Sequence, residues 1–157
     1  GGTGAADLTT DVFQWTLGDA GTAGSPAADT ITDFNANASS AGGDILDLHD
    51  LLVGETSTNL LSFLHFSTSG GNTVISISTT GGYSGGYSAG QTDQTITLTG
   101  VDLVTGHTDA QIIADLLAKG KLVVDGAPLE NYFDKEADIT IFWGSVADFT
   151  GELAKRI

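Results

Sequence analysis

The chain contains no cysteine, and its first 118 residues contain no lysine or arginine. The missing cysteines exclude a disulfide scaffold and a thiolate metal site. Thirteen Asp or Glu residues lie in those 118 positions, and the formal net charge of the whole chain is −15. A field of this sign repels nucleic acid and anionic membranes, so we exclude nucleic acid as a partner. The basic residues all come later, at Lys119, Lys121, Lys135, Lys155 and Arg156.

Long apolar runs are also missing. No run approaches the roughly 20 residues that a membrane-spanning helix needs, so we expect no insertion into a membrane. The first ten residues, GGTGAADLTT, have neither the basic start nor the apolar segment of a secretory signal peptide. A length of 157 residues is enough for one domain with a substantial hydrophobic core.

Short β-branched or aromatic runs predict a mainly β fold, because Gly, Asn and Ser clusters bound each of them. The fourth and fifth runs are joined through TSGGN, which predicts a hairpin, since Gly and Asn tolerate a positive φ. The runs are VFQW (12–15), TITDF (30–34), DILDL (44–48), FLHFS (63–67), TVISIS (73–78) and QTITLTG (94–100).

One amphipathic helix is predicted near the end of this β region. Thr108 and Gln111 have the spacing of a capping box, and Gly120 can close the helix in a left-handed conformation. A second, shorter helix is predicted from Leu48 to Val53, ending at Gly54. The apolar stripe of the first helix consists of Ile112, Ile113, Leu116 and Leu117.

The composition changes after Asp125, where GAPLE introduces a proline and mixed charges. We therefore divide the chain into a domain at 1–125 and an appended segment at 126–157, which is either natural or engineered. Within the segment, ADITIFW (137–143) predicts a strand and SVADFTGELAKRI (145–157) predicts a weak helix.

Aspartates alternate with Ile, Phe and Leu in DTITDFNANASSAGGDILDLHDLL (29–52). Carboxylates so close to a core are costly unless a cation meets them, and no basic side chain is near in sequence. Calcium takes its oxygen ligands from carboxylates, Asn side chains and backbone carbonyls, which such turns supply. The opening GGTGAADL differs at one place from the nonapeptide of calcium-binding β-rolls, with Ala6 in the aspartate position and Asp7 one later.

The alternative is that these aspartates form turns or lie on solvated strand faces, which requires no metal. We favour this alternative for Asp11, Asp50, Asp93 and Asp109. We favour calcium for the aspartates whose neighbours are strongly apolar, namely Asp29, Asp33, Asp44 and Asp47.

Two segments match a hydrolase pattern without its context. GYSGG and GYSAG place Ser84 and Ser88 in Gly-x-Ser-x-Gly, but that mechanism needs the serine on a strand-to-helix turn. The glycine-rich flanks predict a loop anchored by its tyrosines instead, and we expect no enzyme activity. The histidines lack metal-ligand spacing, so we expect no zinc site, and we expect surface or strand positions for His49, His65 and His107.

An ordered set of segments carries a family resemblance. The set resembles the C-terminal target domain of RTX adhesins, which are surface proteins of Gram-negative bacteria exported by type I secretion. The likeness covers residues 1 to about 125, and the pairing of DTITDF with DILDL is also similar to the end of serralysin-type β-rolls. The segments are VFQWTLGDAGTAGSPAADTITDFN, GGDILDLHDLL, LHFSTSGGNTVISIS, QTITLTGVDL and TDAQIIADLLAKGKLVVD.

The resemblance implies a secreted or cell-surface, non-catalytic domain with a calcium-binding β-roll or β-sandwich fold. An ABC exporter and an outer-membrane channel would pass the chain unfolded, after recognising a C-terminal signal. The implied calcium ligands are Asp7, Asp19, Asp29, Asp33, Asp44 and Asp47. The implied signal residues are Thr108, Ile112, Ile113, Leu116, Leu117, Leu122 and Val123.

Two features depart from the family pattern: Ala6 in the nonapeptide, and the 32 residues that follow Asp125. A different class of function stays open, a calcium-dependent adhesion module that binds a sugar or a peptide. Its candidate stacking residues are Trp15, Tyr83, Tyr87 and Trp143.

Overall fold

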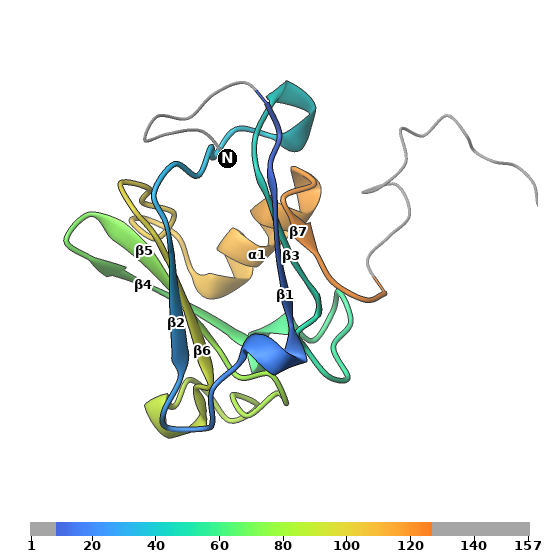
Figure 1. Cartoon of the computed structure of the whole chain (residues 1–157), viewed down its shortest axis with the longest axis vertical. Helices are drawn as coiled ribbons and strands as arrows, with labels where there is room; N and C mark the ends of the chain where they lie inside the picture. The colour runs from blue at the N-terminus through green and yellow to red at the C-terminus, as the bar shows by residue number, and fades with distance from the viewer. Residues whose placement is uncertain (1–8, 127–157) are drawn as a thin grey trace, which may run out of the picture. The chain divides into compact units, whose positions relative to one another are not determined.

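The computed structural model describes residues 9–126. This part of the chain is mainly β, with two sheets and one α-helix (Figure 1). The expectations for Asp7, for Trp143 and for the strand and helix between 137 and 157 lie outside the described residues. The predicted mainly β class is confirmed.

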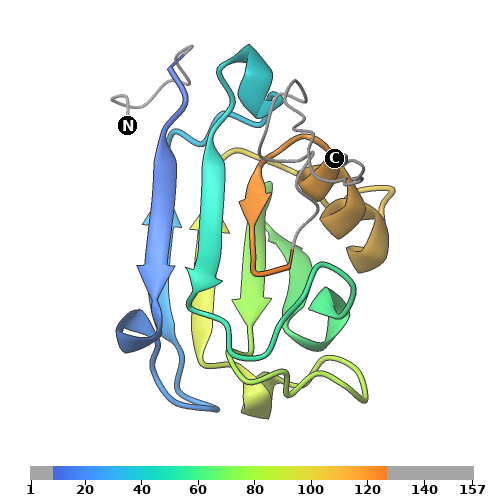
Figure 2. The ribbon, with the colours of Figure 1, turned by 90° about the vertical axis from the view of Figure 1, so that its right-hand side faces the viewer.

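The first sheet contains three parallel strands in the order β1 (Val12–Thr16), β3 (Ile45–Asp50) and β7 (Leu122–Val123). Figure 2 shows them side by side, with the blue and teal strands followed by the short orange one. Alternate residues of β3 are buried, as the period of a half-buried strand requires. Because all three strands run the same way, their carboxyl ends lie at one edge of the sheet.

The second sheet has the order β2 (Ala27–Ile31), β6 (Gln94–Leu98), β5 (Asn72–Ile77) and β4 (Leu64–Ser69). β2 pairs with β6 in parallel, and the other neighbours are antiparallel. Buried side chains from both sheets and from the helix form one hydrophobic core. The hairpin predicted through TSGGN is confirmed as β4–β5, with Gly70 and Gly71 at positive φ.

The helix α1 (Asp109–Ala118) begins with the predicted capping box. The backbone N–H of Gln111 donates to Thr108 Oγ1 over 3.3 Å, and the backbone N–H of Thr108 donates to Gln111 Oε1 over 2.9 Å. Gly120 follows the helix with φ +67°, as expected for a C-terminal cap. Ile112, Ile113 and Leu116 are buried, which confirms most of the predicted stripe.

Two predictions of local structure were wrong. The expected helix from Leu48 to Val53 does not form, because β3 continues to Asp50 between its two parallel partners. The strand expected at 30–34 lies instead at Ala27–Ile31, where each residue pairs with β6. In both cases the pairing of distant strands overrides the local pattern.

Candidate functional site

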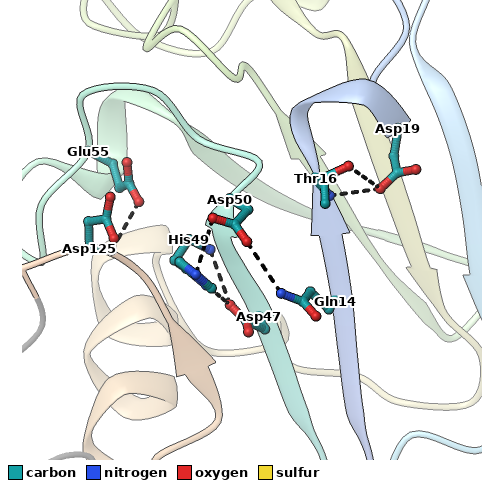
Figure 3. Close-up of polar contacts among 8 residues, drawn as sticks. All are labelled: Gln14, Thr16, Asp19, Asp47, His49, Asp50, Glu55 and Asp125. Carbon is teal, nitrogen blue, oxygen red and sulfur yellow. Dashed lines mark hydrogen bonds and ion pairs between the residues drawn. The ribbon is translucent and has the colours of Figure 1, made fainter.

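Acidic side chains gather where the parallel strands of the first sheet end (Figure 3). Asp19 follows β1, Asp50 ends β3, and Asp125 follows β7. The sequence places an aspartate at or within three residues of the end of each of these strands. We name this group the acidic edge, and it consists of Asp19, Asp47, His49, Asp50, Glu55 and Asp125.

His49 lies between two carboxylates of the acidic edge. Its Nδ1 is 2.5 Å from Asp47 Oδ1, and its Nε2 is 3.2 Å from Asp50 Oδ1. The bond to Asp47 and the charges of Asp47, Asp50 and Asp125 raise the pKa of His49, although partial burial opposes them. A doubly protonated imidazolium can donate to both carboxylates, which a neutral ring cannot. The contact between Asp47 and His49 could have been predicted from the sequence, because residues i and i+2 of a strand lie on the same face.

The other carboxylates of the acidic edge have partners of their own. Asp19 Oδ2 accepts from the backbone N–H of Thr16 over 2.7 Å, and Asp50 Oδ2 accepts from Gln14 Nε2 over 3.4 Å. The side chain of Glu55 is buried and accepts the backbone N–H of Asp125 over 3.0 Å. Between residues 9 and 126, no group of three or more His, Asp or Glu side chains is arranged to hold a metal ion.

Asp29, another predicted calcium ligand, takes part in a hydrogen-bonded bridge between the sheets. Its Oδ2 accepts from Trp15 Nε1 in the first sheet and from Gln94 Nε2 in the second, each over 2.8 Å. Trp15 and Gln94 are both buried. The carboxylate of Asp29 therefore serves two buried N–H donors of the core. Asp33 lies half-buried in the bend after β2.

Asp44 is buried, with 3% of its surface exposed. Its Oδ1 accepts the backbone N–H of Asp11 over 3.0 Å, and its Oδ2 accepts that of Asn35 over 2.8 Å. The charge of Asp44 also acts on Lys121, a lysine with 1% of its surface exposed. This buried carboxylate therefore has an organic cation close to it, supplied from 77 residues further along the chain.

The Lys121 ammonium contacts three groups around Asp44. It donates to the backbone oxygens of Asn35 and Asp44 over 2.7 and 2.6 Å, and it lies 4.5 Å from the centroid of the Phe34 ring. Burial lowers the pKa of Lys121 to about 8, while the carboxylate of Asp44 opposes this shift. The sequence did not reveal Lys121 as the partner of Asp44, because the two residues are 77 positions apart in the chain.

Two of the aspartates assigned to turns or solvated faces have buried or half-buried structural roles. Asp93 is 8% exposed and accepts from the backbone N–H and the hydroxyl of Thr79, over 3.0 and 2.6 Å, so it does not lie on a solvated face. Asp109 opens α1 and accepts the backbone N–H of Phe66 in β4 over 3.0 Å. Its second oxygen lies 2.8 Å from His65 Nδ1. Asp109 thereby fixes the start of α1 against the second sheet.

The glycine-rich loop between β5 and β6 is anchored by tyrosine, as expected. Tyr83 is buried and shares a hydrogen bond of 2.5 Å with Thr92, and burial raises the pKa of Tyr83 to about 12. Tyr87 is 48% exposed and stacks on His65, with 4.0 Å between ring centroids. Ser84 and Ser88 lie in this strand-to-strand loop, so neither occupies the strand-to-helix turn of a hydrolase.

Four of the seven predicted signal residues are buried in the core of the domain. Their side chains come from α1 and from β7, the last strand of the described chain. Thr108 is exposed and caps the helix, while Leu117 and Val123 are half-buried. The buried members are Ile112, Ile113, Leu116 and Leu122.

The described residues include no helix that is both long enough and apolar enough to span a bilayer. A scan against protein-family models and searches of curated proteins and of solved structures found no match to the chain. The family resemblance drawn from the sequence stays a prediction.

Proposed function

We propose that the chain is the non-catalytic C-terminal domain of a secreted RTX adhesin of Gram-negative bacteria. In this proposal, residues 108–125 carry a type I secretion signal, read by an ABC exporter and an outer-membrane channel. The domain folds outside the cell with the help of calcium, and its two sheets form a β-sandwich related to the calcium-binding β-roll. The all-parallel first sheet supports that relation, since β-rolls are built from parallel strands.

The burial of the signal residues is the observation that carries the proposal. Ile112, Ile113 and Leu116 belong to the hydrophobic core, so the native fold conceals them. A transporter that recognises these side chains must therefore meet the chain before it folds. A domain with this arrangement is suited to a route in which folding follows export.

The excess of negative charge supplies a reason for delayed folding. Residues 9–126 contain thirteen acids and two lysines, and such self-repulsion destabilises a compact state. Calcium sites with extracellular affinity, on the order of 10⁻⁴–10⁻³ M, are empty in the cytoplasm and filled outside. The native structure is then favoured only after export.

An export experiment tests the proposed signal. A passenger protein is fused ahead of the chain in a Gram-negative host that carries a type I exporter, and the passenger is measured in cells and medium. Deletion of residues 106–125 is expected to retain the passenger in the cells. Phe66→Ala is the control, because it opens the buried core of β4 and leaves the signal intact. Continued export of the deletion variant would exclude a signal at 106–125.

Exposure of Tyr87 favours a second candidate function, the calcium-dependent binding of a sugar. Trp15 and Tyr83 are buried, whereas Tyr87 presents 48% of its surface beside His65. Aromatic faces of this kind can stack on sugar rings. A glycan array in calcium should then give signals that Tyr87→Ala abolishes, and a blank array would reject this candidate.

A further inference from the structure

The buried ammonium of Lys121 is held by one short loop, residues Phe34–Asp44. The loop supplies two carbonyl oxygens at 2.6 and 2.7 Å and an aromatic face at 4.5 Å. The carboxylate of Asp44 adds a favourable charge nearby. We name the groups around the ammonium the cage: the ring of Phe34, the backbone oxygens of Asn35 and Asp44, and the Asp44 carboxylate.

Bonds within and around the loop shape the cage without using Lys121. The Asn35 side chain accepts the backbone N–H of Asn37 over 3.0 Å and donates to the backbone oxygen of Gly42 over 3.1 Å. Gly43 packs so closely on this turn that an added Cβ would lie 1.7 Å from the Asn37 oxygen. The Asp44 carboxylate joins the two ends of the loop, because it accepts the backbone N–H of Asn35. The loop therefore has bonds that hold its shape independently of the Lys121 side chain.

The same loop also holds the chain on either side of Lys121. The backbone N–H and the hydroxyl of Ser39 both donate to the Lys119 oxygen over 3.1 Å. The Leu46 N–H, just beyond the loop, donates to the Lys121 oxygen over 2.8 Å. The chain between the end of α1 and the start of β7 is thus held at two backbone oxygens, those of Lys119 and Lys121.

The cage has the chemistry of a primary-ammonium site. An ammonium group has three donors at tetrahedral angles, which suits two carbonyl oxygens, and its charge suits an aromatic face and a carboxylate. A calcium ion requires six to eight oxygens, and a guanidinium is planar and wider. We propose that the loop Phe34–Asp44 is a binding site for a primary ammonium group, filled in this chain by Lys121, which latches residues 119–123 onto the first sheet.

Chemical rescue tests the latch. Lys121→Ala empties the cage and leaves a buried carboxylate without its cation, so the melting temperature is expected to fall by more than about 10 °C. Added n-butylammonium chloride at 0.1 M should restore a large part of this loss. Tetramethylammonium chloride carries the same charge without N–H donors and should restore none of it.

Two variants serve as matched controls. Leu122→Ala opens a cavity beside the latch in β7, and butylammonium should not restore its stability. Lys119→Met removes the neighbouring exposed lysine, which pairs with Asp115, and should leave the melting temperature within about 2 °C of the unchanged chain. The proposal would be overturned if butylammonium restored the melting temperatures of Lys121→Ala and Leu122→Ala equally. It would also be overturned if tetramethylammonium restored Lys121→Ala as well as butylammonium does.

A measurement on the unchanged protein covers the case in which Lys121→Ala does not fold. Nitrogen-15 spectra should show one lysine Nζ with slowly exchanging protons and contacts to the Phe34 ring, and Lys121→Arg should remove that signal. If the folded, unchanged protein lacked this Nζ signal, the proposed role of Lys121 would be overturned. Excess EGTA should leave the signal in place in the folded chain, so this test is independent of calcium and of export.

Discussion

One carboxylate oxygen joins three strands of the protein: Asp29 Oδ2 accepts hydrogen bonds from Trp15 and Gln94, and the three residues lie on different strands. Lys121 and Asp44 form a comparable group, with a cation and an acid that are 77 residues apart in the chain. At the scale of single residues, these buried charges are met by donors and acceptors from distant parts of the chain, which local sequence does not reveal. Donors within the chain meet the carboxylates of Asp29 and Asp44, and the calcium expected at these two residues stays a prediction.

The pair of carboxylates around His49 predicts a pH-dependent stability. Because Asp47 and Asp50 raise the pKa of His49 in the folded state, the native chain binds a proton more tightly than the unfolded chain. The stabilisation is complete below pH 6.5 and is lost as the pH rises through the folded pKa. Its size after solvent screening is roughly 0.5–1 kcal/mol.

Urea unfolding between pH 5 and pH 9 measures this dependence. In His49→Gln, the part of the free energy of unfolding that falls with rising pH should disappear. His107→Gln is the control, since His107 is exposed and lies 3.0 Å from a backbone oxygen of Thr105, and its charge is the smallest of the causes that act on the pKa of its neighbour Asp102. If His49→Gln left the pH dependence of the free energy of unfolding unchanged, His49 would not be the group responsible for it.

At the scale of elements, α1 shows how local and distant contacts combine. Its start depends on the Thr108–Gln111 capping box, which is encoded within four residues. Its position depends on Asp109, which accepts the Phe66 N–H of β4. The helix therefore forms from local signals and is placed by a strand more than 40 residues earlier in the chain.

Loss of the cap gives a prediction for this element. Thr108→Ala removes the acceptor for the Gln111 N–H and should lower the free energy of unfolding by about 1 kcal/mol. Asp115→Ala removes only an exposed i,i+4 pair with Lys119 and should stay within about 0.5 kcal/mol of the unchanged chain. Equal losses in the two variants, measured by urea unfolding, would argue against the capping role.

At the scale of the whole molecule, charge imbalance and core burial oppose each other. One core joins both sheets and α1, and the acids of the acidic edge collect at one end of the first sheet. Folding of such a domain is sensitive to anything that reduces the repulsion. This sensitivity is the physical basis of the proposed dependence on calcium.

Calcium should raise the melting temperature of the purified domain relative to excess EGTA. One site with a dissociation constant of about 10⁻⁴ M adds about 2.7 kcal/mol to the free energy of unfolding in about 10 mM calcium, which is a hundred times that constant. Sodium chloride at matched ionic strength, without calcium, is the control for general screening. Identical melting temperatures in EGTA and in millimolar calcium would reject calcium-dependent folding.

The sequence by itself determined the elements whose signals lie within a few residues. These are the capped helix α1, the β4–β5 hairpin with its two glycines, and the loop anchored by Tyr83. Each is encoded locally, through a side chain that bonds a neighbouring N–H, a glycine at positive φ, or a large aromatic side chain in a polar stretch. The mainly β class followed from the same short runs.

Only the tertiary structure decided the bounds of β2, the extension of β3 to Asp50 and the partners of the buried acids. Strand bounds depend on pairing, and β2 pairs with residues more than 60 positions away. The candidate site was predicted in part: Asp19 and Asp47 of the acidic edge were expected as ligands, whereas Glu55, Asp125 and the role of His49 were not predicted. Lys121 reaches Asp44 only because β7 joins the first sheet beside β3, and a one-dimensional pattern carries no record of that contact.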